Sequence, residues 1–432
     1  MIRQDESSCL HDLKGIHMKI LVIGKGGREH ALALALSKSD QCEKLYCAPG
    51  NPGMAQIAEC VPISDEDVDG LRKFAIDNQI DLTVVGPESS LAAGVANAFQ
   101  EAGLKIFAPT KEAAQVESSK DFAKQLMKKY GIPTADYQTF DSYDEAAAYV
   151  RKHGAPIVIK ENGLKAGKGV TVAMSEPEAL EALEIAFSIP GNRVVIEEYL
   201  EGFEFSLIAL VNGDLVVPLE CAQDHKRVGD NDTGPNTGGM GSYSPVRAIT
   251  PEIVQTTMDT IMVPMARALK EEGVPFTGFL YGGLMVTSDG IKTIEFNARF
   301  GDPEAEVILA RLTSDFAEAI EQVLDHQKPD LSWTDQTAHG VVLASAGYPA
   351  SSTKGALIEG LEDLDDVLVY HMGTKNTEQG LVTDGGRVLM AVSLADTLPQ
   401  AMDHTYDEIR KIKSDALFYR NDIGRKDLEE WH

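Results

Sequence analysis

The sequence predicts an α/β protein built from several domains, and three observations support that fold class. Residues 18–120 alternate buried strands with amphipathic helices, which is typical of a parallel sheet with right-handed crossovers. Residues 205–330 and 337–428 continue with strands, helices and glycine turns in a mixed order. The length of 432 residues exceeds what a single hydrophobic core usually serves, so we expect roughly two to four domains.

The composition excludes several classes of function. Asp and Glu number 67 against 39 Lys and Arg, giving a formal net charge of -28, whereas nucleic acids and anionic membranes require a basic surface. We therefore expect neither nucleic acid nor a membrane as a partner, and we find no apolar run long enough to span a bilayer. The five cysteines form no CxxC pair, which indicates a reducing cytoplasm rather than a disulfide framework.

An abrupt change at Met18 separates an N-terminal extension from the first domain. Residues 1–17 lack the basic and apolar regions of a secretory signal, and we interpret them as a disordered extension. Beyond Met18, strands are predicted at 19–23, 44–47, 82–85 and 105–107, and helices at 29–37, 66–78 and 90–102. These elements define an N-terminal α/β domain at 18–120.

A glycine-rich turn joins the first strand to the first helix. It consists of Gly24, Lys25, Gly26, Gly27, Arg28, Glu29 and His30. Glycines let a backbone approach a phosphate, and a helix N-terminus supplies N–H donors and the positive end of a dipole. We favour a phosphate or sugar site here. A dinucleotide site and a purely structural turn are the alternatives, although the dinucleotide spacing is not met because Glu29 stands where a third glycine is needed.

Pro87 and Glu88 follow the strand at 82–85. Ligands of open parallel sheets bind beyond the carboxyl ends of the strands, so Glu88 could accept hydrogen bonds from ribose hydroxyls. A simple turn at the end of a strand is an equally good interpretation.

A smaller unit, the lid, is predicted at 121–204 and begins with a linker helix at 119–131. Its strands are expected at 156–160, 170–173 and 193–197, and its helix at 176–187. Lys160 ends the first of these strands and precedes a glycine-rich loop at 163–170, a position suited to phosphate contact under a closing lid. The P-loop spacing is absent, and a plain hairpin with a lysine-rich tip is the alternative.

An acidic segment ends the lid. Glu197 ends a strand, and Leu200 and Glu204 follow it before the central domain at 205–330. Backbone groups near Leu200 could pair with an adenine edge, and Glu204 could accept from ribose hydroxyls. A solvated acidic hinge is the simpler interpretation of this segment.

Two segments of the central domain offer contacts to an anion. The run Asp224–Arg227 precedes a loop at 234–241 that contains Asn236, Thr237, Gly238, Gly239 and Met240. Such a loop exposes many backbone N–H groups, and two cations stand beside it. We expect a long loop that holds an anion, with a disordered linker as the alternative.

The run from Ile294 to Glu304 is the most informative in the chain. In a strand, Glu295, Asn297 and Arg299 share one face, and the alternate residues Ile294, Phe296 and Ala298 are expected to be buried. A carboxylate and an amide oxygen suit a hard cation such as Mg²⁺, and a guanidinium grips a carboxylate or phosphate. Taken alone, this run fits a solvated edge strand with an ordinary turn better than it fits a site.

The remaining sequence predicts a linker at 331–336 and a C-terminal α+β domain at 337–428. Its strands are expected at 339–346 and 386–393 and its helix at 398–413. The chain contains neither internal repeats nor low-complexity tracts.

Taken in order, the segments 24–30, 224–227, 234–241 and 295–304 resemble the motifs of the phosphoribosylamine–glycine ligase family, within the ATP-grasp superfamily. The resemblance runs from Met18 to about Asp427. It implies an ATP-grasp fold with an N-terminal parallel α/β domain, a small mobile lid, a central mixed α/β domain and a C-terminal α+β domain. It also implies a cytoplasmic, ATP-dependent carbon–nitrogen ligase of de novo purine biosynthesis, which joins glycine to 5-phosphoribosylamine through glycyl phosphate.

The resemblance further implies roles for single residues. ATP should contact Lys120 and Lys160 with its phosphates, Glu197 and Leu200 with its adenine, and Glu204 with its ribose. A magnesium or manganese ion should bind Glu295 and Asn297, while catalysis should use Arg299, Asp224 and Lys226. The phosphoribosylamine should bind Gly26, Gly27, Arg28, Glu29, His30, Pro87, Glu88, Asn236, Thr237, Gly238, Gly239 and Met240, and Asp302 should border the glycine pocket.

The chain departs from the family pattern in its lid, where Glu161, Asn162 and Lys165 replace the usual residues. These changes bear on lid closure and ATP affinity rather than on the class of reaction. The expected partners are small molecules, and the expected assembly is a monomer or a weak dimer. A nicotinamide oxidoreductase, a non-catalytic nucleotide sensor and another ATP-grasp carboxylate–amine ligase are the rival functions.

Overall fold

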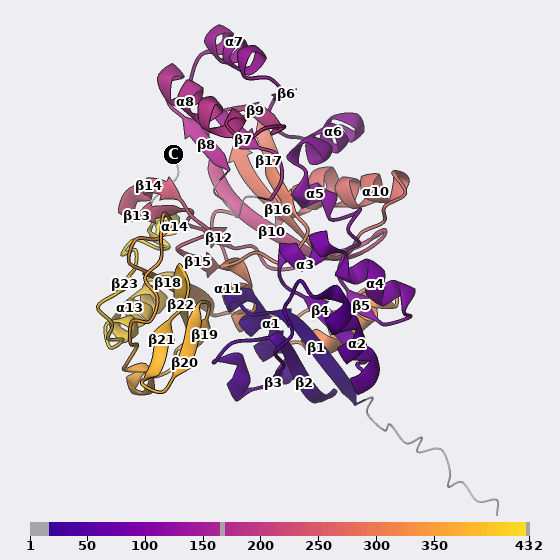
Figure 1. The fold of residues 1–432 in the computed structure, drawn as a ribbon, viewed down its shortest axis with the longest axis vertical. Coiled ribbons are helices and arrows are strands. Elements are labelled where there is room, and N and C mark those ends of the chain that lie inside the picture. Colours follow the sequence, from indigo (N-terminus) through magenta and orange to yellow (C-terminus); the bar gives the residue numbers. More distant parts are fainter. Residues whose placement is uncertain (1–16, 165–168, 429–432) are drawn as a thin grey trace, which may run out of the picture.

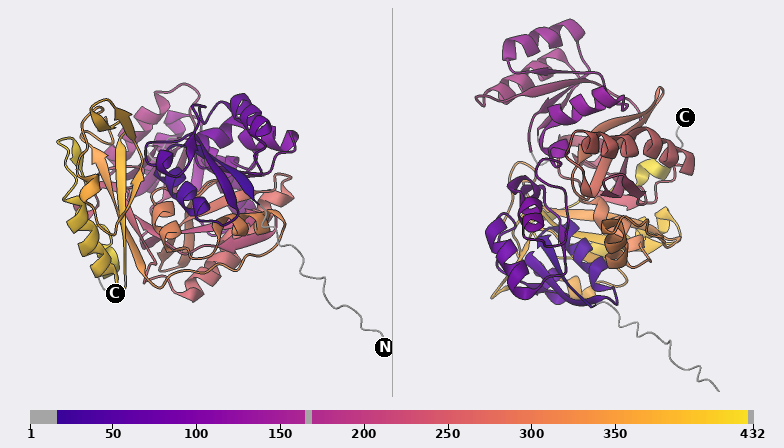
Figure 2. Two further views of the ribbon diagram at one scale, coloured as in Figure 1. Left: turned by 90° about the horizontal axis from the view of Figure 1, so that it is seen from below. Right: turned by 90° about the vertical axis from the view of Figure 1, so that its right-hand side faces the viewer.

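The computed structural model describes residues 17–164 and 169–428 (Figure 1). The interpretation of residues 1–17 and the substitution at Lys165 therefore concern positions outside the described residues, His17 excepted. The lid projects from the rest of the molecule in Figure 1 and in the right-hand view of Figure 2. Within the described part of the chain, none of the helices combines the length and the apolar character that a membrane span requires.

The N-terminal unit is a five-stranded parallel sheet in the order β3-β2-β1-β4-β5. Its strands are β1 (Met18–Gly24), β2 (Cys42–Pro49), β3 (Glu59–Cys60), β4 (Leu82–Val85) and β5 (Ile106–Phe107). The four predicted strands are confirmed, because each is a short apolar run that packs on both faces. The order reverses between β1 and β4, so the crevice between them is the switch point at which ligands of open sheets bind.

The helices of this unit are α1 (Gly27–Ser37), α2 (Val68–Asn78), α3 (Glu88–Ala93) and α4 (Val95–Glu101). The single helix predicted at 90–102 is wrong, because the chain divides it into α3 and α4. Gly94 lies between them with φ of 89°, a left-handed conformation that only glycine adopts without cost.

The lid is a four-stranded antiparallel sheet in the order β6-β9-β7-β8. Its elements are β6 (Tyr137–Phe140), α7 (Tyr143–His153), β7 (Ile157–Glu161), β8 (Val170–Ala173), α8 (Glu176–Phe187) and β9 (Val194–Glu198). The linker helix before it comprises α5 (Gln115–Ser118) and α6 (Lys120–Tyr130). The strand β6 was not predicted, since among its residues only Phe140 is buried and the pattern is weak.

The central unit carries the sheet β11-β10-β16-β17. Its strands are β10 (Phe203–Asn212), β11 (Leu215–Pro218), β16 (Thr277–Thr287) and β17 (Gly290–Asn297), and its helices are α9 (Pro251–Thr257), α10 (Val263–Glu271), α11 (Glu304–Arg311) and α12 (Phe316–Leu324). The loop expected at 234–241 is only partly a loop. Part of it pairs as the hairpin of β13 (Arg227–Gly229) and β14 (Thr233–Asn236).

The C-terminal sheet has the order β12-β15-β18-β22-β19, with β23 beside β18. Two of its strands, β12 (Gln223–Asp224) and β15 (Gly241–Ser244), come from the central stretch. The others are β18 (Thr337–Ser345), β19 (Leu368–His371), β22 (Arg387–Ala395) and β23 (Leu417–Phe418), followed in the chain by α14 (Arg425–Leu428). The covering helix α13 (Leu398–Ile409) ends before the predicted residue 413, because Lys413 pairs with Glu359 instead.

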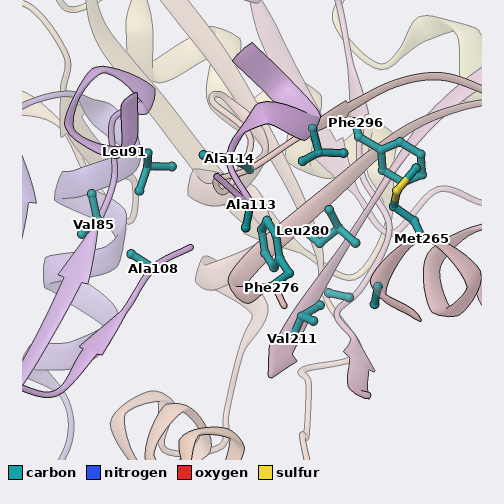
Figure 3. Close-up of a cluster of buried hydrophobic side chains, with 14 of the residues drawn as sticks. Val85, Leu91, Ala108, Ala113, Ala114, Val211, Met265, Phe276, Leu280 and Phe296 are labelled. Atoms are coloured by element: carbon teal, nitrogen blue, oxygen red, sulfur yellow. The ribbon is translucent and has the colours of Figure 1, made fainter. Parts of the chain in front are cut away.

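One apolar cluster joins the N-terminal unit to the central sheet (Figure 3). Val85, Leu91 and Ala108 face Ala113 and Ala114 in the connecting segment, and beyond them lie Phe276, Leu280 and Phe296. All of these side chains are buried. Because removal of such packing leaves costly cavities, the two units are held in one arrangement, which fixes the walls of the site between them.

Candidate active site

A cavity of about 450 Å³ lies where the units meet. The N-terminal unit and linker helix contribute Arg28, Glu88, Glu117, Lys120 and Lys124. The lid contributes Lys160, Gly163, Val170 and Glu197. The central unit contributes Asp224, Lys226, Asn236, Thr237, Gly238, Tyr281, Glu295, Asn297, Arg299, Asp302 and Glu304, and the C-terminal unit contributes Tyr348 and Arg387. The cavity is therefore built from every unit of the fold.

The run at the end of β17 lines this cavity, but without the strict alternation that was predicted. Glu295, Asn297 and Arg299 line it as expected, whereas Ile294 and Phe296 line it too, although Phe296 and Ala298 are buried. The expected burial of Ile294 is wrong. Glu295 pairs with Gly283 and Thr293 with Leu284, so Ile294 is an extra residue that bulges from the ladder and is only partly buried. Its carbonyl accepts a hydrogen bond from Lys160 Nζ at 2.9 Å.

Glu295 stays ionised in this setting. Burial alone would raise the pKa of its carboxyl group, but the charges of Lys226, Lys160, Lys120 and Arg299 outweigh burial and lower the pKa to about 2. Lys226 Nζ lies 3.7 Å from Glu295 Oε1. Asn297 offers a nearly buried amide beside this carboxylate. Among the described residues, no three His, Cys, Asp or Glu side chains are grouped to hold a metal. Glu295 and Asn297 are two neighbouring oxygen donors of the cavity, whose lining also contains other carboxylates.

Arg299 is held between two carboxylates. Its Nε lies 3.3 Å from Glu117 Oε1 and 3.8 Å from Glu88 Oε2, and its guanidinium lies over the ring of Tyr281. Glu117 was not predicted. It accepts a hydrogen bond from the Ala298 N–H at 2.7 Å and thereby fixes the backbone next to Arg299. Burial raises the pKa of Glu117, and the nearby Arg299 opposes that shift.

Two lysines, one from the linker helix and one from the lid, pair with Glu197. Its carboxylate lies 2.9 Å from both Lys124 Nζ and Lys160 Nζ, and all three side chains are nearly inaccessible. Glu197 was expected to lie at the adenine of ATP, but its carboxylate pairs with two lysine ammonium groups instead. Lys120 Nζ donates to the Gly163 carbonyl at 2.9 Å. Lys124 was missed, although it stands four residues after Lys120 and so shares its helix face; burial lowers its pKa to about 8.

The side chain of Glu29 fills the crevice between β1 and β4. Its carboxylate accepts from the Gly26 N–H at 2.6 Å and from Arg28 Nε at 2.6 Å. A Cβ at Gly86 would lie 2.0 Å from Glu29 Oε1, and one at Gly24 would lie 2.4 Å from Glu29 Cγ. These glycines therefore make room for the Glu29 side chain. Its carboxylate already accepts from the Gly26 N–H, the group that was predicted to bind a phosphate.

Of the predicted N-terminal ligands, the structure brings Arg28 and Glu88 to the cavity. Their charged groups lie 3.7 Å apart. The others, Gly26, Gly27, Glu29, His30 and Pro87, do not line it. His30 instead faces the C-terminal unit, where its Nδ1 accepts from the His371 N–H at 2.9 Å. Burial lowers the pKa of His30 to about 3, so this ring is neutral.

The predicted loop at 236–240 lines the cavity only with Asn236, Thr237 and Gly238. Gly239 and Met240 are buried, and Met240 packs in the C-terminal core. The C-terminal unit holds the loop through two side chains that were not predicted. The Gly238 N–H donates to Tyr348 Oη at 3.0 Å, and Arg387 donates to the Gly238 carbonyl at 2.9 Å.

Arg387 also pairs with Asp302. Its NH1 lies 2.8 Å from Asp302 Oδ1, which anchors the turn after β17 to β22. Both side chains line the cavity, and the place of Asp302 at a glycine pocket stays a prediction. Tyr348 and Arg387 belong to segments without a recognisable motif, and only the folded chain identifies them.

Asp224 and Lys226 face the cavity from one extended segment. Burial and the nearby Glu304 raise the pKa of Asp224. For Lys226, burial opposes the charged form, but Glu295 and Glu204 outweigh it and raise the pKa. Glu204 is exposed and lies 3.9 Å from Lys226 Nζ, outside the cavity lining, and Leu200 does not line the cavity either.

Comparison with known families gives consistent matches along the chain. Residues 18–117 match the N domain of phosphoribosylglycinamide synthetase, residues 118–305 its ATP-grasp (A) domain, and residues 338–426 its C domain. The phosphoribosylamine–glycine ligase of Halalkalibacterium halodurans is 54% identical over 419 residues, which cover 96% of this chain and 98% of that protein. The enzyme of the same name from Streptococcus pneumoniae serotype 4 is 50% identical and covers 95% and 100%.

Solved structures agree with these matches. The phosphoribosylamine–glycine ligase of Thermotoga maritima superposes with a TM-score of 0.82 at 32% identity, covering 94% of this chain and all of that one. The biotin carboxylase domain of Hydrogenobacter thermophilus 2-oxoglutarate carboxylase, in complex with MgADP, superposes with a TM-score of 0.69 at 16% identity, covering 93% and 92%. The second likeness concerns the fold alone.

Proposed function

The chain belongs to the phosphoribosylglycinamide synthetase family, and from that premise we propose that it is an ATP-dependent carbon–nitrogen ligase. Its substrates are ATP, glycine and 5-phosphoribosylamine, and its products are glycinamide ribonucleotide, ADP and phosphate. The fold is the ATP-grasp fold with the N and C domains of the family. The reaction belongs to purine biosynthesis, as the names of the relatives indicate.

One observation carries this proposal. A single cavity gathers the lysines of the lid and linker helix, the oxygen donors of β17, and a second set of polar groups from the N-terminal and C-terminal units. A ligase of this kind must hold a nucleotide and an amine together, because joining bound reactants removes the entropic cost of their encounter. A nucleotide sensor would not need the polar groups from the N-terminal and C-terminal units. A nicotinamide oxidoreductase would not need the lysines of the lid and linker helix or the oxygen donors of β17.

The residues present fit ATP with a divalent cation. Lys120 and Lys160 supply positive charge for phosphates, and Lys124 and Glu197 hold Lys160 in place. Glu295 and Asn297 would hold Mg²⁺ or Mn²⁺, since their ionised carboxylate and amide oxygen are hard donors and such ions keep waters and phosphates as further ligands. When bound, the ion would neutralise charge on the phosphate oxygens.

The chemistry proceeds in two displacements. A carboxylate oxygen of glycine attacks the γ-phosphorus of ATP, forming glycyl phosphate and releasing ADP. The amine of phosphoribosylamine then attacks the glycyl carbonyl carbon, a proton leaves the nitrogen, and the C–O bond to phosphate breaks. Arg299 is placed to orient the glycine carboxylate and to stabilise charge on the transferred group. Asp224 is the candidate for taking the amine proton, because burial raises its pKa and so makes its carboxylate a stronger base.

The second subsite is proposed from the groups that line the cavity away from the lid. Arg28 and Asn236 supply donors for a sugar phosphate, Thr237 and Gly238 border it, and Glu88 supplies an acceptor for ribose hydroxyls. Asp302 borders the glycine position. Leu200 and Glu204 remain predicted ATP contacts that lie outside the cavity lining in this arrangement of the lid. The domain boundaries at 120, 204 and 330, the cytoplasmic location and the monomeric or weakly dimeric state also stay predictions.

A coupled assay of ADP formation tests the proposal. Purified protein is supplied with ATP, Mg²⁺ and either glycine, phosphoribosylamine formed in situ from ribose 5-phosphate and ammonia, or both. We expect rapid ADP release only when both are present, together with glycinamide ribonucleotide in equal amount. ADP release that ignores glycine, or that follows a different carboxylate with higher kcat/KM, would favour another ATP-grasp ligase.

A further inference from the structure

Arg420 is among the largest fully buried side chains of the described residues, and it lies outside the cavity. Its side chain is 1% exposed and makes four hydrogen bonds. Nε and NH2 donate to the two carboxylate oxygens of Asp422 at 2.8 Å each, whereas NH1 donates to Asp232 Oδ1 at 3.1 Å and to the Arg227 carbonyl at 2.9 Å. Two of these contacts reach a segment almost 200 positions earlier in the chain.

The segment that Arg420 holds is a strained turn. Asn231 and Asp232, in the turn between β13 and β14, have φ of 55° and 52°, a left-handed conformation that is costly for residues other than glycine. Neighbours of Arg420 fix this turn as well. The Asn231 N–H donates to Asp422 at 2.8 Å, and the Asn421 N–H donates to Asp230 at 2.8 Å. Such strain persists only where surrounding contacts determine it.

His225 connects the same C-terminal segment to the cavity. The chain is extended here, so Asp224 and Lys226 face the cavity while His225 points the opposite way and is 1% exposed. The Gly424 N–H donates to His225 Nε2 at 3.2 Å. The backbone of His225 is paired on both sides, with its N–H donating to Gly241 and its carbonyl accepting from Met240.

We propose that the segment 420–424 is a positioning element for the active site, with Arg420 setting the location of Asp224 and Lys226 through the β13–β14 turn and through His225. The inference rests on the proposed ligase function. Arg420 donates a hydrogen bond to the backbone carbonyl of Arg227, the residue directly after Lys226. The Gly424 N–H donates to the ring of His225, which stands between Asp224 and Lys226. A shift of this segment moves both cavity groups together, and misplacement by about 1 Å costs roughly a hundredfold in rate.

The test compares Arg420→Lys with a matched control. Arg311 is also buried, and it also donates four hydrogen bonds, but to Gln336, Glu220, Ser244 and Thr334, none of which belongs to 224–227 or to the β13–β14 turn. We expect Arg420→Lys to lower kcat for ligation roughly ten- to hundredfold while the KM for ATP stays within about twofold, because the lid lysines are untouched. Arg311→Lys should lower Tm comparably and leave kcat near that of the wild type.

A double variant separates positioning from plain stability. If Arg420 acts through the positions of Asp224 and Lys226, then Arg420→Lys should lower kcat by a smaller factor in the Lys226→Ala background than in the wild type, because only Asp224 is left to be misplaced. Losses that multiply, a wild-type kcat in Arg420→Lys, or equal kcat losses in the two arginine variants would each overturn the inference. If Arg420→Lys does not fold, Asn421→Ala removes the hydrogen bond from Asn421 Nδ2 to Asp230 and leaves the backbone N–H bond to Asp230 in place. It should show the same selective loss of kcat on a smaller scale, and an unchanged kcat there would also overturn the inference. A wild-type enzyme that fails to ligate would count against the proposed function instead.

Discussion

Arg299 is confined by its ion pairs, and this confinement defines where its guanidinium can act. Glu117 and Glu88 both approach its Nε, and its guanidinium lies over the Tyr281 ring. Both carboxylates neutralise the charge only in part, since each lies more than 3 Å away. The remaining N–H groups are therefore available to a carboxylate or a phosphoryl group that enters the cavity.

Arg299→Ala should abolish glycine-dependent ADP release while ATP still binds. The lysines around Glu197 do not depend on Arg299, so the Kd for ATP should change by less than about threefold, whereas kcat should fall roughly a hundredfold or more. Calorimetric titration with ATP and the coupled ADP assay measure the two quantities. The exposed arginine variant Arg410→Ala is the control, and unchanged turnover in Arg299→Ala would refute the assigned role.

The buried lysine pair gives a second prediction. Lys160→Met should raise the KM for ATP, because a phosphate contact is lost and Glu197 keeps only Lys124 as partner. Lys124→Met should raise it less, by loosening Glu197 and Lys160 without removing a phosphate ligand. Breaking a buried pair costs about 3–5 kcal/mol, so Tm should also fall in both variants. The exposed Lys128→Met on the same helix should alter neither quantity, and an unaltered ATP KM in Lys160→Met would exclude that contact.

Single residues of the site could be predicted from the sequence only where they belonged to a local pattern, such as the alternation of a strand. Glu295, Asn297 and Arg299 were readable from strand alternation, because a period of two decides which side chains share a face. Tyr348 and Arg387 were not, since their proximity to Gly238 arises from long-range packing. His30 looked like a ligand in its motif, yet its ring serves the contact with His371.

At the scale of elements, the glycines around the first crevice are explained by Glu29. This carboxylate caps α1 through the Gly26 N–H and occupies the switch point between β1 and β4. At this end of the sheet, Arg28 and Glu88 are therefore the residues that line the cavity, and the glycines of the turn do not contribute to its lining.

Gly86→Ala should destabilise the N-terminal unit. The new Cβ would lie 2.0 Å from Glu29 Oε1, and overpacking of this kind costs about 1–3 kcal/mol. The double variant Gly86→Ala with Glu29→Ala lacks the carboxylate that clashes with the new Cβ. Its free energy of unfolding should therefore be higher than the value obtained by adding the destabilisations of the two single variants. Urea denaturation measures all four proteins. Strict additivity would show that Glu29 is not what excludes a side chain at Gly86.

Elements were predicted well where a continuous apolar run or a capped amphipathic pattern defined them. The strand at 82–85 and the helix at 176–187 have the predicted bounds, and α6 ends at Gly131 in its left-handed conformation as expected. The failures have local causes. The bulge at Ile294, the break at Gly94 and the β13–β14 hairpin each depend on one or two backbone conformations that an apolar pattern does not register.

For the whole molecule, buried histidines predict sensitivity to mild acid. Burial lowers the pKa of His30 and His225 to about 3 and of His339 and His371 to about 4. In the unfolded chain each imidazole has a pKa near 6.5, so the unfolded state binds protons more readily than the folded state. The neutral, buried form therefore stabilises the fold fully above pH 6.5. As the pH falls toward 4, this stabilisation is lost at up to about 1.4 kcal/mol per pH unit for each histidine.

Urea midpoints measured from pH 7.5 to 5 should therefore fall below pH 6.5. His30→Asn removes one such group while keeping an acceptor for the His371 N–H, and it should make the fall shallower. The exposed His153→Asn is the control and should reproduce the wild-type curve. A midpoint that is flat across this range would contradict the buried, neutral state assigned to these rings.

The central claim is that one cavity joins glycine to an amine through glycyl phosphate, and oxygen tracing tests it most directly. Glycine labelled with ¹⁸O in its carboxylate is turned over with ATP, Mg²⁺ and phosphoribosylamine, and the released phosphate is analysed by mass spectrometry. The account predicts one ¹⁸O atom in each phosphate, because the carboxylate oxygen that attacks ATP leaves with the phosphoryl group. Phosphate without label, released in step with ligation, would contradict it.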